Sequence, residues 1–149
     1  MASYSFRKVT IIKMNKPGEK NLNKDLQWFS DSLGLFSERD KERSCFRIFV
    51  ELVKGARQGI AYSSDELALR TNLSRGTVVH HLSKLIESGL VITHNGRYIL
   101  RISNLEALVE EVKKDLIRVF DDLKGIAGEL DEELGLIKRK EEKSKVIEG

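Results

Sequence analysis

An Asn-Gly pair stands between two short β-rich runs in the middle of the chain. The runs are residues 90–93 (LVIT) and 97–100 (RYIL), and the pair is Asn95-Gly96. Both central positions of a tight hairpin turn require positive φ, which Asn and Gly tolerate, so this pattern is the strongest short-range hairpin signal. The sequence therefore predicts a two-stranded hairpin here, and the segments before it must deliver the chain to its first strand.

A short helix and a longer one are predicted just before the hairpin. Ser63 and Glu66 have the S-x-x-E spacing of a capping box, which opens a helix over residues 64–71. After a break at residues 72–73, Ser74 is placed to cap a second helix over 75–88. Gly89 is expected as its left-handed C-cap. The inward stripe of the second helix is Val78, Leu82, Leu85 and Ile86.

An apolar helix over residues 41–55 and a brief strand at 60–62 complete this middle region. The helix is expected to end at Gly55, and Cys45 is interpreted as a small, buried apolar residue. Its predicted inward residues are Phe46, Phe49, Val50 and Val53. The resulting order is helix, strand, helix, tight turn, helix, hairpin, over residues 40–103.

The first 39 residues form an extension with one predicted helix. Apolar residues at 4-3-4 spacing in 22–33 favour a helix that ends at Gly34. Residues 6–12 fit either a short strand or an arm, and the Pro17 turn separates them from the helix. The extension matches no family motif.

The order of elements in 40–103 is that of a winged helix-turn-helix domain. Residues 73–85 (LSRGTVVHHLSKL), followed by 87–91 (ESGLV), resemble the recognition helix and wing entry of ArsR- and MarR-like prokaryotic regulators, bacterial or archaeal. The resemblance implies a transcription regulator that binds double-stranded DNA, with helix 75–88 in the major groove and a short wing at 94–97. It implies a mainly α fold with a small β-hairpin (α+β).

Residues on the outer side of helix 75–88 and at the wing are the candidates for DNA contact. Ser74 and the first-turn amides suit a phosphate, and Gly76 leaves room for close approach. Arg75 could read guanine or grip phosphate, and the sequence leaves both open. Arg97 would lie near the wing tip. The predicted set is Ser74, Arg75, Gly76, Thr77, His80, His81, Lys84, Asn95 and Arg97.

The longest periodic signal lies in residues 104–137, which predict one long helix. Apolar residues follow a 3.5-residue repeat, the pattern of a coiled-coil surface, which favours a homodimer through this helix. A higher oligomer and either helix direction stay open, and the alternative is a helix folded back on its own domain. The predicted dimerisation residues are Leu105, Val109, Val112, Leu116, Val119, Leu123, Ile126 and Leu130. Ile137 continues the repeat, and residues 138–149 are predicted to be a flexible charged tail.

Charge divides the chain in the same way. Residues 1–103 carry 17 basic and 10 acidic side chains, and residues 104–149 carry 9 and 13. A polyanion is therefore the expected partner of the first part, whereas the acidic helix should stand away from DNA. The composition also favours a cytoplasmic protein from a thermophile, with no membrane segment.

Catalytic and metal-binding motifs are not found. There is no Gly-rich phosphate loop, G-x-S-x-G or H-E-x-x-H, so we expect no enzyme and no cofactor. A metal site is not expected, because the chain has a single cysteine and His80 and His81 point about 100° apart on a helix. The sequence leaves any effector unidentified. The alternative function is a winged-helix protein-interaction module of the transcription or replication machinery.

Overall fold

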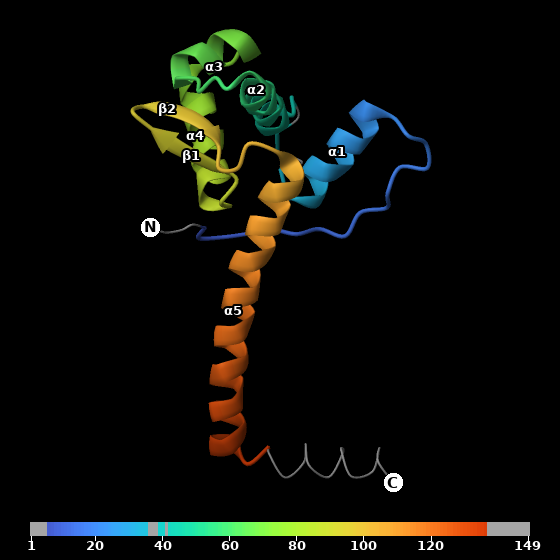
Figure 1. Ribbon diagram of the computed structural model, residues 1–149, viewed down its shortest axis with the longest axis vertical. Coiled ribbons are helices and arrows are strands. Elements are labelled where there is room, and N and C mark those ends of the chain that lie inside the picture. Colours follow the sequence, from blue (N-terminus) through green and yellow to red (C-terminus); the bar gives the residue numbers. More distant parts are fainter. Residues whose placement is uncertain (1–5, 36–38, 41, 137–149) are drawn as a thin grey trace. The chain divides into compact units, whose positions relative to one another are not determined.

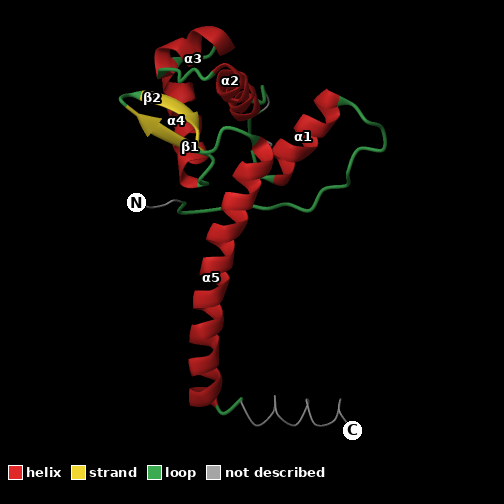
Figure 2. Ribbon diagram, in the orientation of Figure 1, coloured by secondary structure: helices red, strands yellow, loops and turns green. Residues whose placement is uncertain are grey.

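The computed structural model describes residues 6–35, 39–40 and 42–136 (Figure 1). The chain is mainly helical with one small antiparallel hairpin, as predicted (Figure 2). Its elements are α1 (Leu22–Ser32), α2 (Ser44–Gln58), α3 (Ser64–Thr71), α4 (Arg75–Glu87), β1 (Val91–His94), β2 (Arg97–Leu100) and α5 (Leu105–Leu134). Ile137 and the predicted tail lie outside the described residues.

Two compact units make up the chain, Met1–Val112 and Lys113–Gly149. The first unit has a core centred on α2, whose Ile48, Phe49 and Leu52 are fully buried. The Phe49 ring stacks on Phe29 of α1 with 6.3 Å between centroids, which joins the N-terminal helix to this core. The other fully buried apolar residues of the core are Leu67, Val78, Leu82, Leu85, Leu90, Val91 and Leu108.

Helix α2 differs from its prediction at both ends. It begins at Ser44, because the Asp40 carboxylate accepts hydrogen bonds from the Ser44 and Cys45 amides at 2.9 and 3.0 Å. It continues through Gly55 and ends at the left-handed Gly59. The buried side of α2 is also rotated from the predicted side. Of the four residues predicted to face inward, only Phe49 is buried, so the other three predictions were wrong. Cys45, Ile48, Phe49 and Leu52 face the core, whereas Phe46, Val50 and Val53 are half-buried.

The helix-turn-helix and the hairpin follow the sequence prediction closely. The Ser63 hydroxyl accepts a hydrogen bond from the Glu66 amide at 3.1 Å, and the Ser74 hydroxyl accepts one from the Thr77 amide at 3.2 Å. Both predicted caps are therefore confirmed. Asn95 and Gly96 have φ of 53° and 72°, as the predicted turn requires. The segment 60–62, predicted as a strand, contributes only one bridge. In it, the Tyr62 and Tyr98 amides donate to each other's carbonyl oxygens at 3.1 and 2.7 Å.

Residues 6–20 form neither helix nor strand and lie as an extended arm against α4 and α1 of the same unit. The Arg7 and Lys8 amides donate to the Glu87 carbonyl at 2.6 and 3.2 Å, at the end of α4. The Ile12 amide donates a hydrogen bond to the Ser32 carbonyl oxygen, and the Trp28 indole nitrogen donates one to the Met14 carbonyl oxygen. The sequence left open whether residues 6–12 form a strand or an arm. In the structure they form an arm, which covers the last turn of α4.

Asn104 caps the start of helix α5, because its side-chain oxygen accepts a hydrogen bond from the Ala107 amide at 2.9 Å. In the first unit it buries Leu108 and Val112. Val112 therefore packs within its own unit and is not available to a partner helix, which corrects one predicted dimerisation residue. In the second unit, Val119, Leu123, Ile126 and Leu130 are exposed, as are Phe120 and Leu134. No helix in the described part of the chain has the length and apolar character needed to cross a membrane.

Candidate nucleic-acid interface

The two sides of α4 have opposite character. Val78, Leu82 and Leu85 are buried against α2 and the hairpin. The outer side is exposed throughout its length and is polar apart from Val79. Its residues are Gly76, Val79, His80, Ser83 and Glu87, with Arg75 at the first helical position. Since a recognition helix needs one free face for base edges and phosphates, α4 has the required form.

The first turn of α4 is the most open part of this surface. The Ser74 hydroxyl accepts the Thr77 amide and donates to the Thr77 hydroxyl at 2.8 Å. Arg75 is 71% exposed and has only a loose ion pair with Asp65 at 3.4 Å, which contributes little at a solvated surface. A Cβ added to Gly76 would meet nothing within 4 Å. Another molecule can therefore approach the helix N-terminus without displacing protein atoms.

His81 does not lie on this outer surface, so its assignment as a DNA contact was wrong. Its side chain is only 9% exposed, with Nε2 3.9 Å from an Asp40 oxygen, and Nδ1 is buried with no hydrogen-bond partner. His81 is three residues after Val78 and four before Leu85, so it shares the inward face of the helix. The sequence did not show that Asp40 and the arm would close over this position.

Burial of His81 predicts a pH-dependent stability. Burial lowers the pKa of His81, Asp40 opposes this, and the net pKa lies below its ordinary value of 6.5. Below about pH 6.5 the unfolded chain therefore binds more protons than the folded one, and the free energy of unfolding decreases as the pH is lowered. We expect a lower free energy of unfolding at pH 5.5 than at pH 7.5, measured by urea denaturation. The difference should shrink in His81→Gln and persist in the exposed-site control His80→Gln; an unchanged difference in His81→Gln would contradict the assignment.

Lys84 lies at the edge of the outer surface. It is exposed, but it also lines a cavity of about 250 Å³ together with His81, Cys45 and residues 8 and 10 of the arm. Burial raises the pKa of the neighbouring Cys45 thiol to about 11, so this cysteine stays protonated. Lys84 is thus placed between the candidate interface and the arm-covered side of α4.

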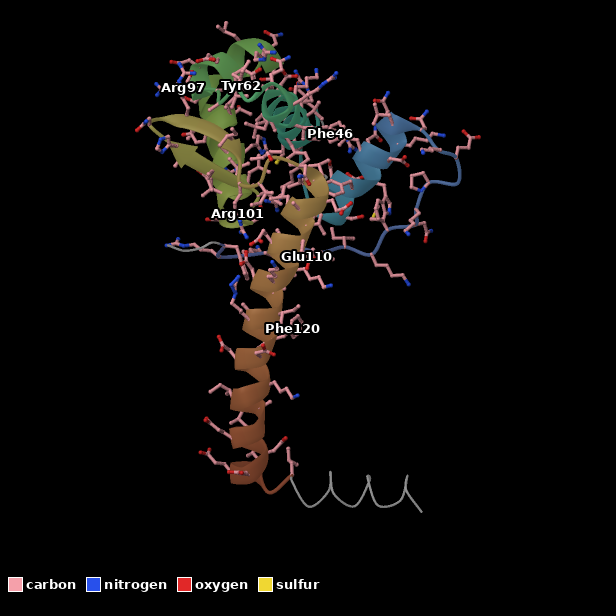
Figure 3. The ribbon with its side chains drawn as sticks, viewed as in Figure 1. Phe46, Tyr62, Arg97, Arg101, Glu110 and Phe120 are labelled. Carbon is pink, nitrogen blue, oxygen red and sulfur yellow. The ribbon has the colours of Figure 1, made fainter. Side chains whose placement is uncertain are left out.

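The wing arginine turns back toward the domain. Arg97 lies at the start of β2, and its Nη1 is 2.7 Å from a Glu66 carboxylate oxygen and 3.0 Å from the Ala61 carbonyl oxygen (Figure 3). In this position Arg97 fastens the hairpin to α3, and part of its charge is compensated. Asn95 is exposed at the turn. The structure therefore brings the first turn of α4 to the surface, while the predicted wing arginine is held by its own domain.

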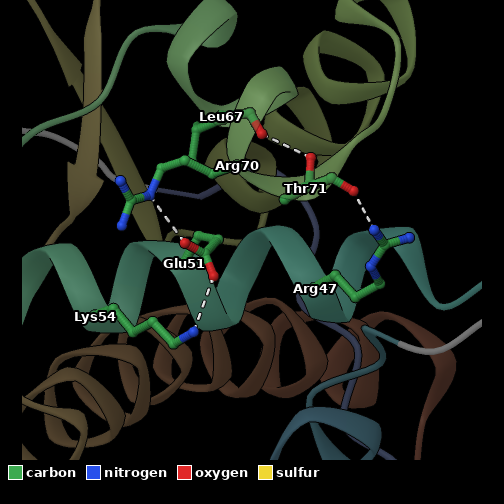
Figure 4. A network of polar contacts seen from close by, with 6 residues as sticks. All are labelled: Arg47, Glu51, Lys54, Leu67, Arg70 and Thr71. Carbon is green, nitrogen blue, oxygen red and sulfur yellow. Dashed lines mark hydrogen bonds and ion pairs between the residues drawn. The ribbon is translucent and has the colours of Figure 1, made fainter.

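A polar network holds α3 on α2 and so fixes the geometry of the turn before α4 (Figure 4). Glu51 pairs with Arg70 at 3.0 Å and with Lys54 at 3.1 Å. The Arg47 guanidinium donates to the Thr71 carbonyl oxygen, and the Thr71 hydroxyl donates to that of Leu67. These contacts orient the two helices that position Ser74 and Arg75.

Ser83 belongs to the outer surface but was absent from the predicted set. Its hydroxyl is exposed and donates to the Val79 carbonyl at 3.0 Å, so its oxygen can still accept. The signal that could have found it is its spacing of four residues from Val79 and three from His80. Among the described residues there is no group of three or more His, Cys, Asp or Glu side chains that could hold a metal ion.

Three helices, the tight turn and the hairpin define a winged helix-turn-helix domain. The family model described as bacterial regulatory protein, arsR family, matches residues 60–93, which run from the Tyr62 segment into β1. Over this segment the chain is similar to the winged helix-turn-helix domain of ArsR-like regulators, and the match supports DNA binding in transcription regulation. No curated protein and no solved structure is significantly similar to the chain.

Proposed function

We propose that the protein is a sequence-specific regulator that binds double-stranded DNA as a homodimer, with α4 in the major groove. The observation that carries this proposal is the open first turn of α4, where an exposed arginine, a capped helix N-terminus and an unobstructed glycine adjoin. All three lie within the segment that matches the regulator family.

The chemistry of this turn suits the edge of a DNA groove. A helix N-terminus favours a phosphate because its free amides and the helix dipole point outward. Arg75 has donors for a guanine edge or a phosphate, and it needs to give up only a weak surface pair with Asp65. Val79, His80 and Ser83 continue the same surface along the helix and could contact bases. Arg97 is already paired with Glu66, so we assign the wing a smaller contribution.

Self-association is proposed through the second unit. Val119, Leu123, Ile126 and Leu130 are all exposed and repeat at 4-3-4 spacing along α5. With Phe120 and Leu134 beside them they form an apolar stripe, which is unusual on a helix that faces only water. A second copy of the chain supplies the same stripe, and two copies would present two α4 helices to neighbouring half-sites.

The direct test of DNA binding is the salt dependence of affinity together with an Arg75→Ala variant. We expect the affinity for a genomic DNA site that the protein recognises to fall steeply as the salt concentration rises. Arg75→Ala should weaken binding roughly tenfold or more, since a good arginine contact provides about 1–3 kcal/mol. Gel shift or fluorescence anisotropy measures both.

The matched control is Lys24→Ala on α1, which removes one positive charge away from α4. This control should change affinity much less than Arg75→Ala. Equal losses in the two variants would show that only overall charge matters. Absence of binding to any duplex at low salt would overturn the proposal and favour a protein-interaction module.

A further inference from the structure

An open apolar groove of about 480 Å³ lies between α1 and the start of α5, and no residue of α4 lines it. Its apolar residues are Leu22, Leu26, Phe29, Leu105 and Val109, all within the first unit. Leu22 is 82% exposed and Val109 is 41% exposed, so the first unit leaves this surface uncovered. Behind it the Phe29 ring is held by its stack on Phe49, which gives the groove a firm floor.

All charges that line the groove are negative. Asp25 comes from α1, and Glu106 and Glu110 come from the first two turns of α5; Figure 3 labels Glu110 there. No lysine, arginine or histidine lines the groove, and none of the three carboxylates forms an ion pair within the described residues. Asp25 and Glu106 stabilise their helices from first-turn positions, but Glu110 lies beyond the first turn, where that effect has faded.

The charge and the size of the groove distinguish between possible occupants. A two-fold contact with a second copy centred here would bring six carboxylates together, and like charges at an interface are costly. The groove extends over only two turns of α1, about 10 Å, which is short for a docked helix. Its volume falls in the range of small-molecule sites, and its lining combines apolar side chains with a few charged groups.

We propose that this groove binds a small lipophilic organic cation, an apolar or aromatic body that carries one positive charge. The apolar body rests on Leu26, Phe29 and Val109, where it leaves water. The charge lies among Asp25, Glu106 and Glu110 at the edge of the groove, and the Phe29 ring face adds to the attraction for a cation. The site is separate from the proposed DNA interface and does not depend on it.

The test uses two probes of the same shape and opposite charge, tetraphenylphosphonium and tetraphenylborate. Isothermal titration calorimetry of the full chain should show one phosphonium ion bound per chain. The borate should bind at least about tenfold more weakly, because three carboxylates surround its charge. Equal affinity for the two probes would overturn the proposal, since only apolar adhesion would then be present.

Variants locate the site. Glu110→Gln should weaken phosphonium binding about two- to fivefold, the effect of one partly exposed charge, and Glu129→Gln in the second unit is the matched control. Val109→Trp fills the groove and should abolish binding while circular dichroism shows an unchanged helix content. If no phosphonium binds, or if Val109→Trp binds it as well as the original chain, the proposal fails. DNA binding in the same preparation would leave the proposed function standing in either case.

Discussion

Replacing Leu123 and Ile126 together by glutamate is expected to convert the protein into a monomer and to weaken DNA binding about 100- to 10,000-fold. Both side chains are exposed on α5 and belong to the apolar stripe that we assign to dimerisation. In a paired helix each would be surrounded by apolar side chains, and a buried carboxylate without a partner is strongly unfavourable. The dimer should therefore dissociate, although each chain would keep its own core.

The loss of DNA affinity follows from the geometry of two half-sites. In a dimer, binding of one α4 holds the second near its half-site at a high effective concentration, which alone contributes a factor of about 10²–10⁴. A monomer lacks this gain, while its single α4 contact should remain. Light scattering after gel filtration measures the mass, and anisotropy measures affinity for a full site and for a half-site.

The matched control places two glutamates on the same helix outside the stripe, as Gly125→Glu and Gly128→Glu. Neither glycine has a heavy atom within 4 Å of an added Cβ, so the substitution meets no steric barrier in the chain. This variant carries the same added charge and should stay dimeric. If the stripe variant keeps the mass of a dimer, the interface lies elsewhere and this part of the proposal is wrong.

Local signals in the sequence predicted local structure well. The Ser63 and Ser74 caps and the Asn95-Gly96 turn depend on contacts within three residues, so their geometry can be read from spacing alone. The same holds for the first turn of α4. Within the candidate interface, the caps and turns are therefore the parts whose structure is determined by residues close together in the sequence.

The errors concern contacts between segments far apart in the sequence. Helix α2 has apolar residues on several sides, so periodicity could not select its buried face, and its start depends on the Asp40 side chain four residues earlier. His81 is buried because Asp40 lies beside it and the arm crosses the end of α4. Likewise, the repeat in α5 continued through Val112 although the first unit buries that residue. Periodicity identifies an apolar face, but it does not say what covers it.

Gly55 shows how far such a contact can oppose local propensity, and Gly55→Ala is expected to destabilise the protein by about 3 kcal/mol, at the upper end of overpacking costs. In a helix interior, alanine is ordinarily favoured over glycine by about 1 kcal/mol. Here, however, an added Cβ would lie 2.7 Å from the Ile60 carbonyl oxygen and 2.8 Å from the Tyr62 ring. The Ile60 amide also donates to the Gly55 carbonyl at 2.8 Å, so the following segment cannot easily move away.

The same contact links the core to the wing, because Tyr62 forms the bridge to Tyr98 of β2. Urea denaturation of Gly55→Ala should therefore show a lower midpoint, and amide exchange of Tyr98 should be faster if the bridge loosens. Gly128→Ala is the matched control, a helix glycine with nothing within 4 Å of an added Cβ, and it should leave the midpoint unchanged or raise it. A Gly55→Ala protein as stable as the original would mean that the close approach of Ile60 and Tyr62 does not constrain the helix.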